Sequence, residues 1–401
     1  TVMSPSSLLV ALVVAVVALV GAGTPVPGRV SQLVTDFGLR LFRAALGPRG
    51  DTNVVLAPHG ATSVLVALQV ATAGRGRRQL EEALGFSIDA PGVSAELREL
   101  RRALEGGPGQ GLAVAEGLFV GRGVALTPGF ARRALRALGP RSVARVDFAR
   151  REGARTLLDS WVRERTKGLL GSLVPPGALG PRTRLVVASA QFFRGRWATP
   201  FPPRATRARP FRRADGSDVA VPMMARAGTF RCGEFETPAG VPYSVVEVPY
   251  EGGAVSMLLV APLERDVPIV TLTRLLDSPR VTHWVTNLSP APRLLVLPCF
   301  SLETTWDLRP PLKSLGVLDL FDPEAADFTP LSGEEHLVLG QALQRVRMEV
   351  TENGTEVASA TAAIVYSRMA PLEIILDRPF LFLIRHGPTG TILFVGQVTE
   401  P

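Results

Sequence analysis

Arg368 is the residue whose type and position best fit a chemical role. It is the only basic residue between Arg347 and Arg378, and Met369 follows it. Trypsin-like proteases bind a basic side chain in a pocket that holds a carboxylate. A lone arginine in an exposed loop is therefore expected to attract them to the Arg368–Met369 bond. The alternative interpretation is a solvated loop arginine with no such role. The residues around Arg368 distinguish between these two interpretations.

The segment around this bond has an unusual composition. Residues 351–371 read TENGTEVASATAAIVYSRMAP, which is too apolar for a plain loop and too polar for a permanently buried strand. Every second residue from Thr355 to Val365 is small or β-branched, whereas the other set includes Glu352, Glu356 and Tyr366. Successive strand residues face opposite sides. The pattern therefore predicts a segment that is an exposed loop in one state and a buried strand in another.

The length of this segment suits a full strand of a large sheet. From Gly354 to Arg368 it would span roughly 50 Å at about 3.3 Å per residue. The strand pattern of residues 345–350 leads into it, with Val346, Met348 and Val350 on one face. An apolar segment from Leu372 to Ile384 follows it.

The elements that must position this segment follow from hydrophobic periodicity. Expected helices cover residues 30–46, 60–73, 75–84 and 94–104, and expected strands cover residues 185–193, 243–248, 255–260, 294–297, 345–350, 380–384 and 391–398. Helices dominate early and strands dominate later. This order predicts an α+β fold in which helices pack around large, mainly antiparallel β-sheets.

The N-terminus resembles a targeting segment. Residues 8–20 form an apolar run of about 13 residues, too short for a membrane helix of about 20. Small residues follow at positions 21–23. We expect a signal peptide over residues 1–23, no membrane span, and one domain over residues 24–401.

The two cysteines, Cys232 and Cys299, allow at most one disulfide, and two free thiols are the preferred interpretation.

Composition and motifs argue against an enzyme. The chain has no HExxH helix, no Walker loop and no GxSxG elbow, and its four histidines lack metal spacing. We expect no metal and no cofactor. A catalytic site assembled only in space is the weaker alternative. The net charge of +8 could attract polyanions, most directly through Arg98, Arg101 and Arg102, or could be spread over a solvated surface.

Several motifs resemble those of the serpin family. Residues 374–384 read IILDRPFLFLI, residues 352–356 read ENGTE, and residues 53–58 read NVVLAP. Residues 161–168 (WVRERTKG) and 193–201 (FRGRWATPF) also match, so the resemblance extends from about residue 30 to Pro401. The stretch SRMAP at residues 367–371 resembles serpins that inhibit plasminogen activators.

The resemblance implies a suicide inhibitor with an exposed reactive-centre loop at about residues 352–371. The protease would attack the carbonyl carbon of Arg368 and form an acyl-enzyme. The loop would then enter the main sheet and trap the protease. The hinge that starts this insertion would comprise Glu352, Gly354, Thr355, Glu356, Val357 and Ala358. Val357 departs from the small alanine usual there, and Ser189 and Asp159 stand where asparagines are usual.

The implied targets are the tissue-type and urokinase-type plasminogen activators, bound covalently, with Glu373 as a second contact outside the bait bond. Such a protein would be a secreted, extracellular monomer that regulates fibrinolysis and binds no nucleic acid. Two alternatives remain. One is an arginine-bait serpin against another trypsin-like protease such as thrombin, and the other is a non-inhibitory binding serpin.

Further partners are implied by position within the family pattern. Vitronectin would contact Arg122, Ala131 and Leu135, and heparin would contact Arg98, Arg101 and Arg102. Two glycosylation sequons occur, at Asn287 and Asn353. A glycan on Asn353 would obstruct the hinge, so we expect that residue to stay largely unmodified.

Overall fold

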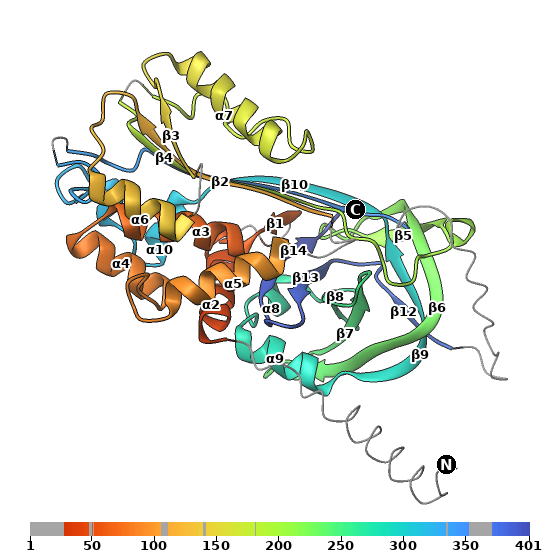
Figure 1. Ribbon diagram of the computed structural model, residues 1–401. Helices are drawn as coiled ribbons and strands as arrows, with labels where there is room; N and C mark the ends of the chain where they lie inside the picture. The colour runs from red at the N-terminus through yellow and green to blue at the C-terminus, as the bar shows by residue number, and fades with distance from the viewer. Residues whose placement is uncertain are drawn as a thin grey trace, which may run out of the picture.

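The computed structural model describes residues 28–47, 50, 52–105, 111–138, 142–180, 182–333, 336–352 and 371–401. The expected signal peptide over residues 1–23 lies outside these residues. Two β-sheets and a set of helices make up the described part of the chain (Figure 1).

The first sheet has five strands in the order β10-β11-β4-β2-β3. Their bounds are Phe300–Asp307 (β10), Gln341–Val350 (β11), Leu185–Phe193 (β4), Leu112–Gly121 (β2) and Val143–Val146 (β3). β11 pairs with β4 in parallel, although the two strands are far apart in sequence. β2 and β3 are also parallel, whereas β10–β11 and β2–β4 are antiparallel.

The second sheet has nine strands, eight of which follow the order β1-β14-β13-β8-β7-β6-β9-β12, and β5 pairs with β6. Their bounds are Val54–Leu56 (β1), Ile392–Val398 (β14), Phe380–His386 (β13), Val255–Pro262 (β8), Pro242–Pro249 (β7), Asp218–Glu236 (β6), Ser289–Pro298 (β9), Leu372–Ile375 (β12) and Arg207–Arg212 (β5). Only the β12–β9 pair in this sheet is parallel, so β12 is an edge strand held by β9 alone among the described residues.

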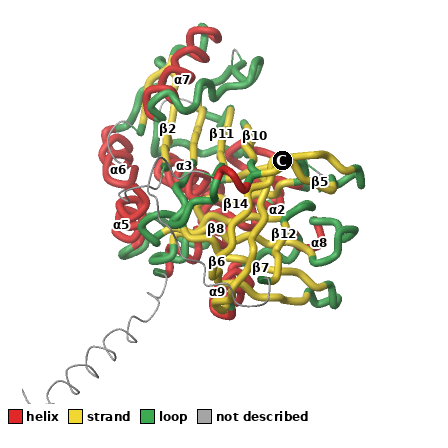
Figure 2. The backbone as a smooth tube through the Cα atoms, turned by 90° about the vertical axis from the view of Figure 1, so that its right-hand side faces the viewer, coloured by secondary structure: helices red, strands yellow, loops and turns green. Residues whose placement is uncertain are grey.

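Most of the longer helices lie on the two faces of the five-stranded sheet (Figures 1 and 2). The longer α-helices have the bounds Arg29–Leu46 (α2), Pro58–Ala71 (α3), Gly74–Leu84 (α4), Val93–Glu105 (α5), Pro128–Leu138 (α6), Arg151–Arg165 (α7) and Ser278–Asn287 (α9). Short turns of helix occupy Val270–Thr273 (α8), Arg309–Ser314 (α10), Pro203–Ala205 (η1) and Asp319–Phe321 (η2). α7 covers one face, and α2 to α6 lie on the other side of the sheet.

The core follows this division. A large apolar cluster joins the nine-stranded sheet, α2, α3 and one face of the five-stranded sheet. A smaller cluster fills the space between α7 and the opposite face of the five-stranded sheet, and includes Leu158, Phe119 and Phe192. α3 is buried on nearly all sides because small residues let its neighbours approach closely. A Cβ on Gly38 of α2, for example, would overlap the Pro58 ring.

The predicted α+β class is confirmed, and the predicted elements match the observed ones with shifts of a few residues at their ends. Val346, Met348 and Val350 share the buried face of β11, as the alternation predicts. β2, the long β6 and α7 were not among the predicted elements. No helix within the described ranges is both long enough and apolar enough to cross a membrane.

Candidate functional site

The unusual segment begins where β11 ends. Thr351 and Glu352 follow Val350, and the described chain resumes at Pro371, just before β12. The predicted bait residues Arg368 and Met369 therefore lie outside the described residues. The same holds for Gly354, Thr355, Glu356, Val357, Ala358 and the sequon at Asn353.

Glu352, the first residue of the predicted hinge, contacts its surroundings at several points. Its carboxylate accepts a hydrogen bond from Thr206 Oγ1 at 2.7 Å, and its carbonyl accepts one from the Phe201 amide at 3.2 Å. Cys299 also contacts it. Burial first, and then the charge and hydrogen bond of Glu352, raise the pKa of the Cys299 thiol to about 11. The hinge therefore starts from a fixed point.

An aromatic stack supports the residue before the hinge. The Trp197 indole nitrogen donates to the Thr351 carbonyl at 2.9 Å. Trp197 stacks on Tyr250 with ring centroids 4.4 Å apart and an interplanar angle of 8°, and both rings are buried. Trp197 belongs to the stretch FRGRWATPF, and the tertiary structure places this stretch beside Thr351, the residue before the predicted hinge.

The seam between β4 and β11 is the geometric centre of the site. Gln341 lies opposite Val186 and Met348 lies opposite Phe193, so the two strands run side by side and end at the same edge of the sheet. Thr351 and Glu352, which follow β11, lie at that edge. A segment that turned back between the two strands would run antiparallel to both and hydrogen-bond on both edges.

A buried polar cluster holds this seam closed from the α3 side. Gln344 on β11 lies opposite Ser189 on β4, and its Nε2 donates to Ser189 Oγ at 3.1 Å. The same amide group accepts from the Ala57 backbone N–H at 3.1 Å and donates to the Ala57 carbonyl at 2.9 Å. Sequence reasoning singled out Ser189 but missed Gln344. Its place among apolar residues on the buried face of a strand was the available signal.

Asp159, the second residue that departs from the family pattern, acts outside the seam. Its carboxylate accepts from the Leu173 amide at 2.6 Å and the Val174 amide at 3.2 Å. It thereby ties α7 to the segment that follows the helix.

Glu373 lies on the exposed part of β12. Its register partner on β9 is Leu294. The neighbouring Leu372 is 70% exposed, which is unusual for a large apolar side chain. Because β12 begins three residues after Met369, both side chains are close in sequence to the predicted bait bond.

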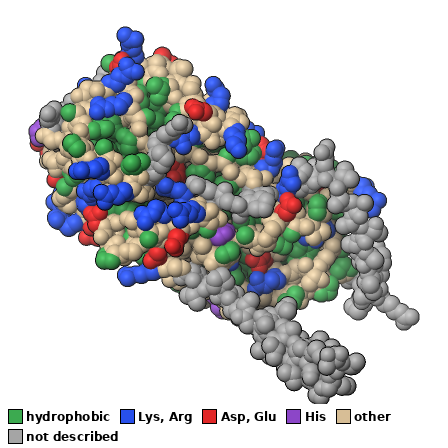
Figure 3. Space-filling model, in the orientation of Figure 1, with side chains coloured by type: hydrophobic (Ala, Val, Ile, Leu, Met, Phe, Trp, Pro, Cys, Tyr) green, Lys and Arg blue, Asp and Glu red, His purple; other side chains and the backbone are tan. Residues whose placement is uncertain are grey.

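The basic residues of α5 do not all face the same way. Arg98 and Arg102 are exposed and one helical turn apart, whereas Arg101 is half-buried and lines a small cavity with His59 and Glu116. Figure 3 shows Lys and Arg side chains gathered over the region of α5 and α6. The predicted heparin residues thus form an exposed pair and one inward-facing member.

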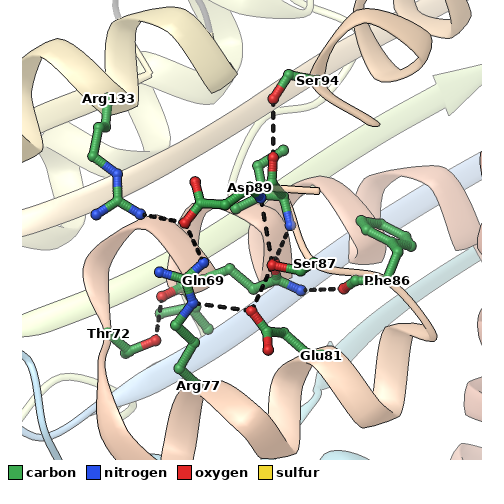
Figure 4. Close-up of polar contacts among 11 residues, drawn as sticks. Gln69, Thr72, Arg77, Glu81, Phe86, Ser87, Asp89, Ser94 and Arg133 are labelled. Carbon is green, nitrogen blue, oxygen red and sulfur yellow. Dashed lines mark hydrogen bonds and ion pairs between the residues drawn. The ribbon is translucent and has the colours of Figure 1, made fainter. Parts of the chain in front are cut away.

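A polar network fixes α4, α5 and α6 relative to one another (Figure 4). Asp89 pairs with Arg77 of α4 at 2.5 Å and with Arg133 of α6 at 3.2 Å. Gln69 of α3 donates to the Phe86 carbonyl and accepts from the Ile88 amide. The network also neutralises two arginines near α5, which reduces the positive charge of this surface.

The predicted vitronectin residues are all exposed at the protein surface. Ala131 and Leu135 are one turn apart on α6, and Leu135 is 58% exposed. Arg122 is exposed in the turn after β2, and its carbonyl accepts a hydrogen bond from the Arg145 guanidinium at 3.1 Å.

Asn287 is the sequon residue that lies within the described part of the chain. It is the last residue of α9, it is exposed, and its side-chain amide donates a hydrogen bond to the His283 carbonyl at 2.7 Å.

The described cysteines and histidines form no metal cluster or disulfide. Cys232 is buried on β6 and Cys299 is half-buried beyond the end of β9, and both are free thiols. No group of three His, Cys, Asp or Glu side chains within the described ranges could hold a metal ion. The two free thiols agree with the preferred interpretation of the sequence.

The comparisons with known proteins agree with this geometry. The serpin (serine protease inhibitor) family model matches residues 32–401. Plasminogen activator inhibitor 1 of Sus scrofa is 46% identical over 372 residues, which cover 92% of each chain. Plasminogen activator inhibitor 1 of Mus musculus is 44% identical over 403 residues, which cover 100% of each chain.

A solved structure shows the same fold. Native protease nexin-1 with heparin superposes with a TM-score of 0.87 at 33% identity, and the match covers 93% of this chain and 99% of that one. The match over nearly the whole chain, together with a parallel seam beside the hinge, shows that this chain belongs to the serpin family of serine protease inhibitors, as the resemblance predicted, and is not an enzyme.

Proposed function

We propose that this chain is a secreted suicide inhibitor of the tissue-type and urokinase-type plasminogen activators, with Arg368–Met369 as its bait bond. The observation that carries the proposal is the closed β4–β11 seam beside the hinge, in a chain 46% identical to a plasminogen activator inhibitor 1. The loop would insert at the seam, and the similarity to this relative indicates which class of protease is the target.

The mechanism uses the seam as the acceptor of a new strand. The protease attacks the Arg368 carbonyl carbon, the bond to Met369 breaks, and the new α-amine leaves with Met369. The loop, still joined to β11 through Glu352, turns back between β4 and β11. One parallel pairing is replaced by two antiparallel pairings, which adds backbone hydrogen bonds. The attached protease is carried along before water can release it.

In this mechanism, Thr355 is the first loop side chain that must be buried between β4 and β11. It belongs to the set that alternation places toward the core, so a charge there would lose its hydration without a partner. We expect Thr355→Arg to convert the inhibitor into a substrate. Glu356→Arg is the matched control, because it adds a positive charge to the same loop on the opposite face.

The primary experiment is incubation of the purified protein with urokinase-type activator, followed by a denaturing gel. A band near the summed mass that survives boiling in detergent supports the proposal. Cleavage after Arg368 without that band argues for a substrate, and stable complexes with Thr355→Arg would disprove the hinge assignment. A panel that includes tissue-type activator and thrombin separates the proposed targets from the arginine-bait alternative by relative rate.

Glu373 is proposed as a second contact with the protease. It is exposed on edge strand β12, close in sequence to the bait bond. Glu373→Ala should slow complex formation a few-fold, since exposed charges act mainly on association rates. Unchanged rates against both plasminogen activators would remove this contact from the proposal.

Heparin and vitronectin are proposed as further partners. The heparin proposal rests on exposed Arg98 and Arg102 and on the heparin-bound nexin-1 relative, with Arg101 in a lesser role because it faces inward. The vitronectin proposal rests on the exposed group Arg122, Ala131 and Leu135. Binding of each partner to Arg98→Gln/Arg102→Gln and to Leu135→Asp, measured by surface plasmon resonance, tests them separately.

A further inference from the structure

A cleft of about 950 Å³ opens between the end of α7 and the edge of the five-stranded sheet where β4 ends. Part of its lining is apolar, from residues that also belong to the α7 side of the core: Ala113, Leu169 and Phe192. Leu112 and Val114 of β2 border the cleft as well, but they also line the small cavity with His59, so Ala113 is the β2 residue on the α7 side. The volume lies in the range of about 300–1,000 Å³ common for small-molecule sites.

Four cationic side chains surround this apolar lining. Arg165 is the last residue of α7 and Lys167 follows it closely, while Arg194 and Arg196 come directly after β4. Among the described lining residues, Glu352 is the only carboxylate. The cleft therefore brings positive charge together from two elements that are separate in the sequence.

Most of these cations are available to a ligand. Arg196 pairs with Glu251 at 3.6 Å, but both side chains are about half exposed, at 49% and 52%. Arg194 pairs with Glu349 at 3.2 Å and is 57% exposed. The exposed Arg196–Glu251 pair contributes little, and the Arg194 guanidinium reaches solvent although Glu349 is only 18% exposed, so an incoming anion can contact both arginines. Lys167 makes no ion pair within the part of the chain that the structure describes.

The turn after α7 holds Lys167 in place. Its backbone has φ 53°, a left-handed conformation that is uncommon for residues with a side chain. The turn is closed by hydrogen bonds from the Lys167 amide to the Glu164 carbonyl at 3.2 Å and from the Gly168 amide to the Arg163 carbonyl at 2.8 Å. The Lys167 side chain therefore starts from a constrained position at the cleft wall.

We propose that this cleft binds a compact organic polyanion, with several sulfate or phosphate groups on one ring. Guanidinium groups bind such oxyanions through paired hydrogen bonds, and the apolar lining can contact the face of a ring. The site is distinct from the exposed arginines of α5, which lie on the opposite side of the sheet.

The consequence for inhibition rests on the proposed function. A polyanion bound by α7 and by the end of β4 links the two elements beside the hinge. It also repels the Glu352 carboxylate at the edge where the loop must enter. Bound ligand should therefore slow insertion, so that more inhibitor is cleaved and less is trapped with the protease.

The test is calorimetric titration of the intact protein with two single-ring probes, inositol hexasulfate and inositol hexakisphosphate, in separate experiments. Lys167→Gln/Arg196→Gln should weaken binding by about tenfold or more, because each charged hydrogen bond contributes roughly 1.5 kcal/mol or more. Arg98→Gln/Arg102→Gln removes the same charge from α5 and should leave the affinity nearly unchanged. Glu352→Gln should tighten binding, because it removes the carboxylate. The probe that binds more tightly identifies the sulfate or phosphate class.

The outcomes separate this proposal from the proposed function. Loss of affinity in the α5 variant but not in the cleft variant, or no binding of either probe, overturns the site. Because the titration uses no protease, its result tests ligand binding by the cleft even if the protein forms no covalent complex. When complexes do form, the bound probe should raise the ratio of cleaved to complexed inhibitor in the wild type and not in Lys167→Gln/Arg196→Gln. An equal rise in both proteins overturns the link between the cleft and insertion.

Discussion

The β13–β14 pair and the β4–β11 pair are both central and both buried, yet they are built differently. β13 and β14 are antiparallel, and their buried side chains are mostly aliphatic or aromatic, from Phe380 to Val398. β4 and β11 are parallel, and their α3 side carries the polar pair Ser189 and Gln344. Separating the first pair would expose apolar surface to water. Separating the second breaks hydrogen bonds that an incoming strand can replace.

This difference is what the proposed mechanism requires, namely a permanent core together with a sheet that can open. The permanent pair depends on close packing, which has no substitute once lost. The seam depends on directional bonds, which can be exchanged for others.

The largest effect is expected from Gly396→Ala in β14. A Cβ there would overlap the Phe382 ring and lie 2.5 Å from the Val54 carbonyl oxygen. Overpacking of this kind should cost about 3 kcal/mol of unfolding free energy. Gly171→Ala is the matched control, because its Cβ would meet open space. Equal melting temperatures for the two variants would contradict the description of this pair as tightly packed.

Gln344→Leu should destabilise the fold less and open the seam more. It leaves the buried Ala57 N–H without its partner, which costs about 2 kcal/mol. Gln397→Leu on β14 is the matched control, because Gln397 is also fully buried and bonds the Gly50 and Thr52 carbonyls. Denaturant unfolding should show similar losses. Only Gln344→Leu should shorten the half-life of inhibitory activity, and equal half-lives would remove the special role of the seam.

Acid should weaken the region beneath the seam through His59 of α3. Burial first, and then the charge of Arg101 on α5, lower the pKa of His59 to about 4, while the Glu116 carboxylate on β2, 3.6 Å away, acts in the opposite direction. The unfolded chain takes up this proton near pH 6.5 and the folded chain does not. The stability due to neutral His59 is therefore present above pH 6.5 and is lost as the pH falls toward 4.

Between pH 7 and pH 5 this loss should be about 1.5 kcal/mol, from the free energy attached to each pKa unit. His59→Phe should flatten the dependence in urea unfolding curves measured across that range. A variant at the exposed His283 serves as the control and should keep the wild-type slope. If the unfolding free energy of His59→Phe depends on pH as steeply as that of the wild type, a group other than His59 causes the loss of stability in acid.

The smallest effect is expected from Ser189→Ala. Gln344 loses one hydrogen bond but keeps both bonds to Ala57, so the cost should stay below about 1 kcal/mol. The seam should still open somewhat faster, as measured by the decay of inhibitory activity. A loss of stability as large as that of Gln344→Leu would show that Ser189, and not Gln344, is the main link across the seam.

Much of this fold could be predicted because it depends on residue types and spacings within short stretches of the sequence. Alternation of Val346, Met348 and Val350 was sufficient for the buried face of β11, and helical periodicity was sufficient for α2 to α5. The family motifs are also local, so the resemblance could be drawn from them. β6 was missed because arginines, glycines and a proline interrupt its 19 residues and hide the strand pattern. β2 was missed because its small residues, such as Ala113, Ala115 and Gly117, give weak apolar periodicity.

The sequence by itself determined the α+β class and the family, and it predicted the bait residue and the hinge, since each of these depends on residue type and short-range spacing. Only the tertiary structure decided which residues meet. It placed Gln344 opposite Ser189, turned Arg101 away from Arg98 and Arg102, and brought Arg165 and Lys167 to the same cleft as Arg194 and Arg196. Such contacts join residues far apart in the chain, and packing and strand register select them, which no local pattern encodes.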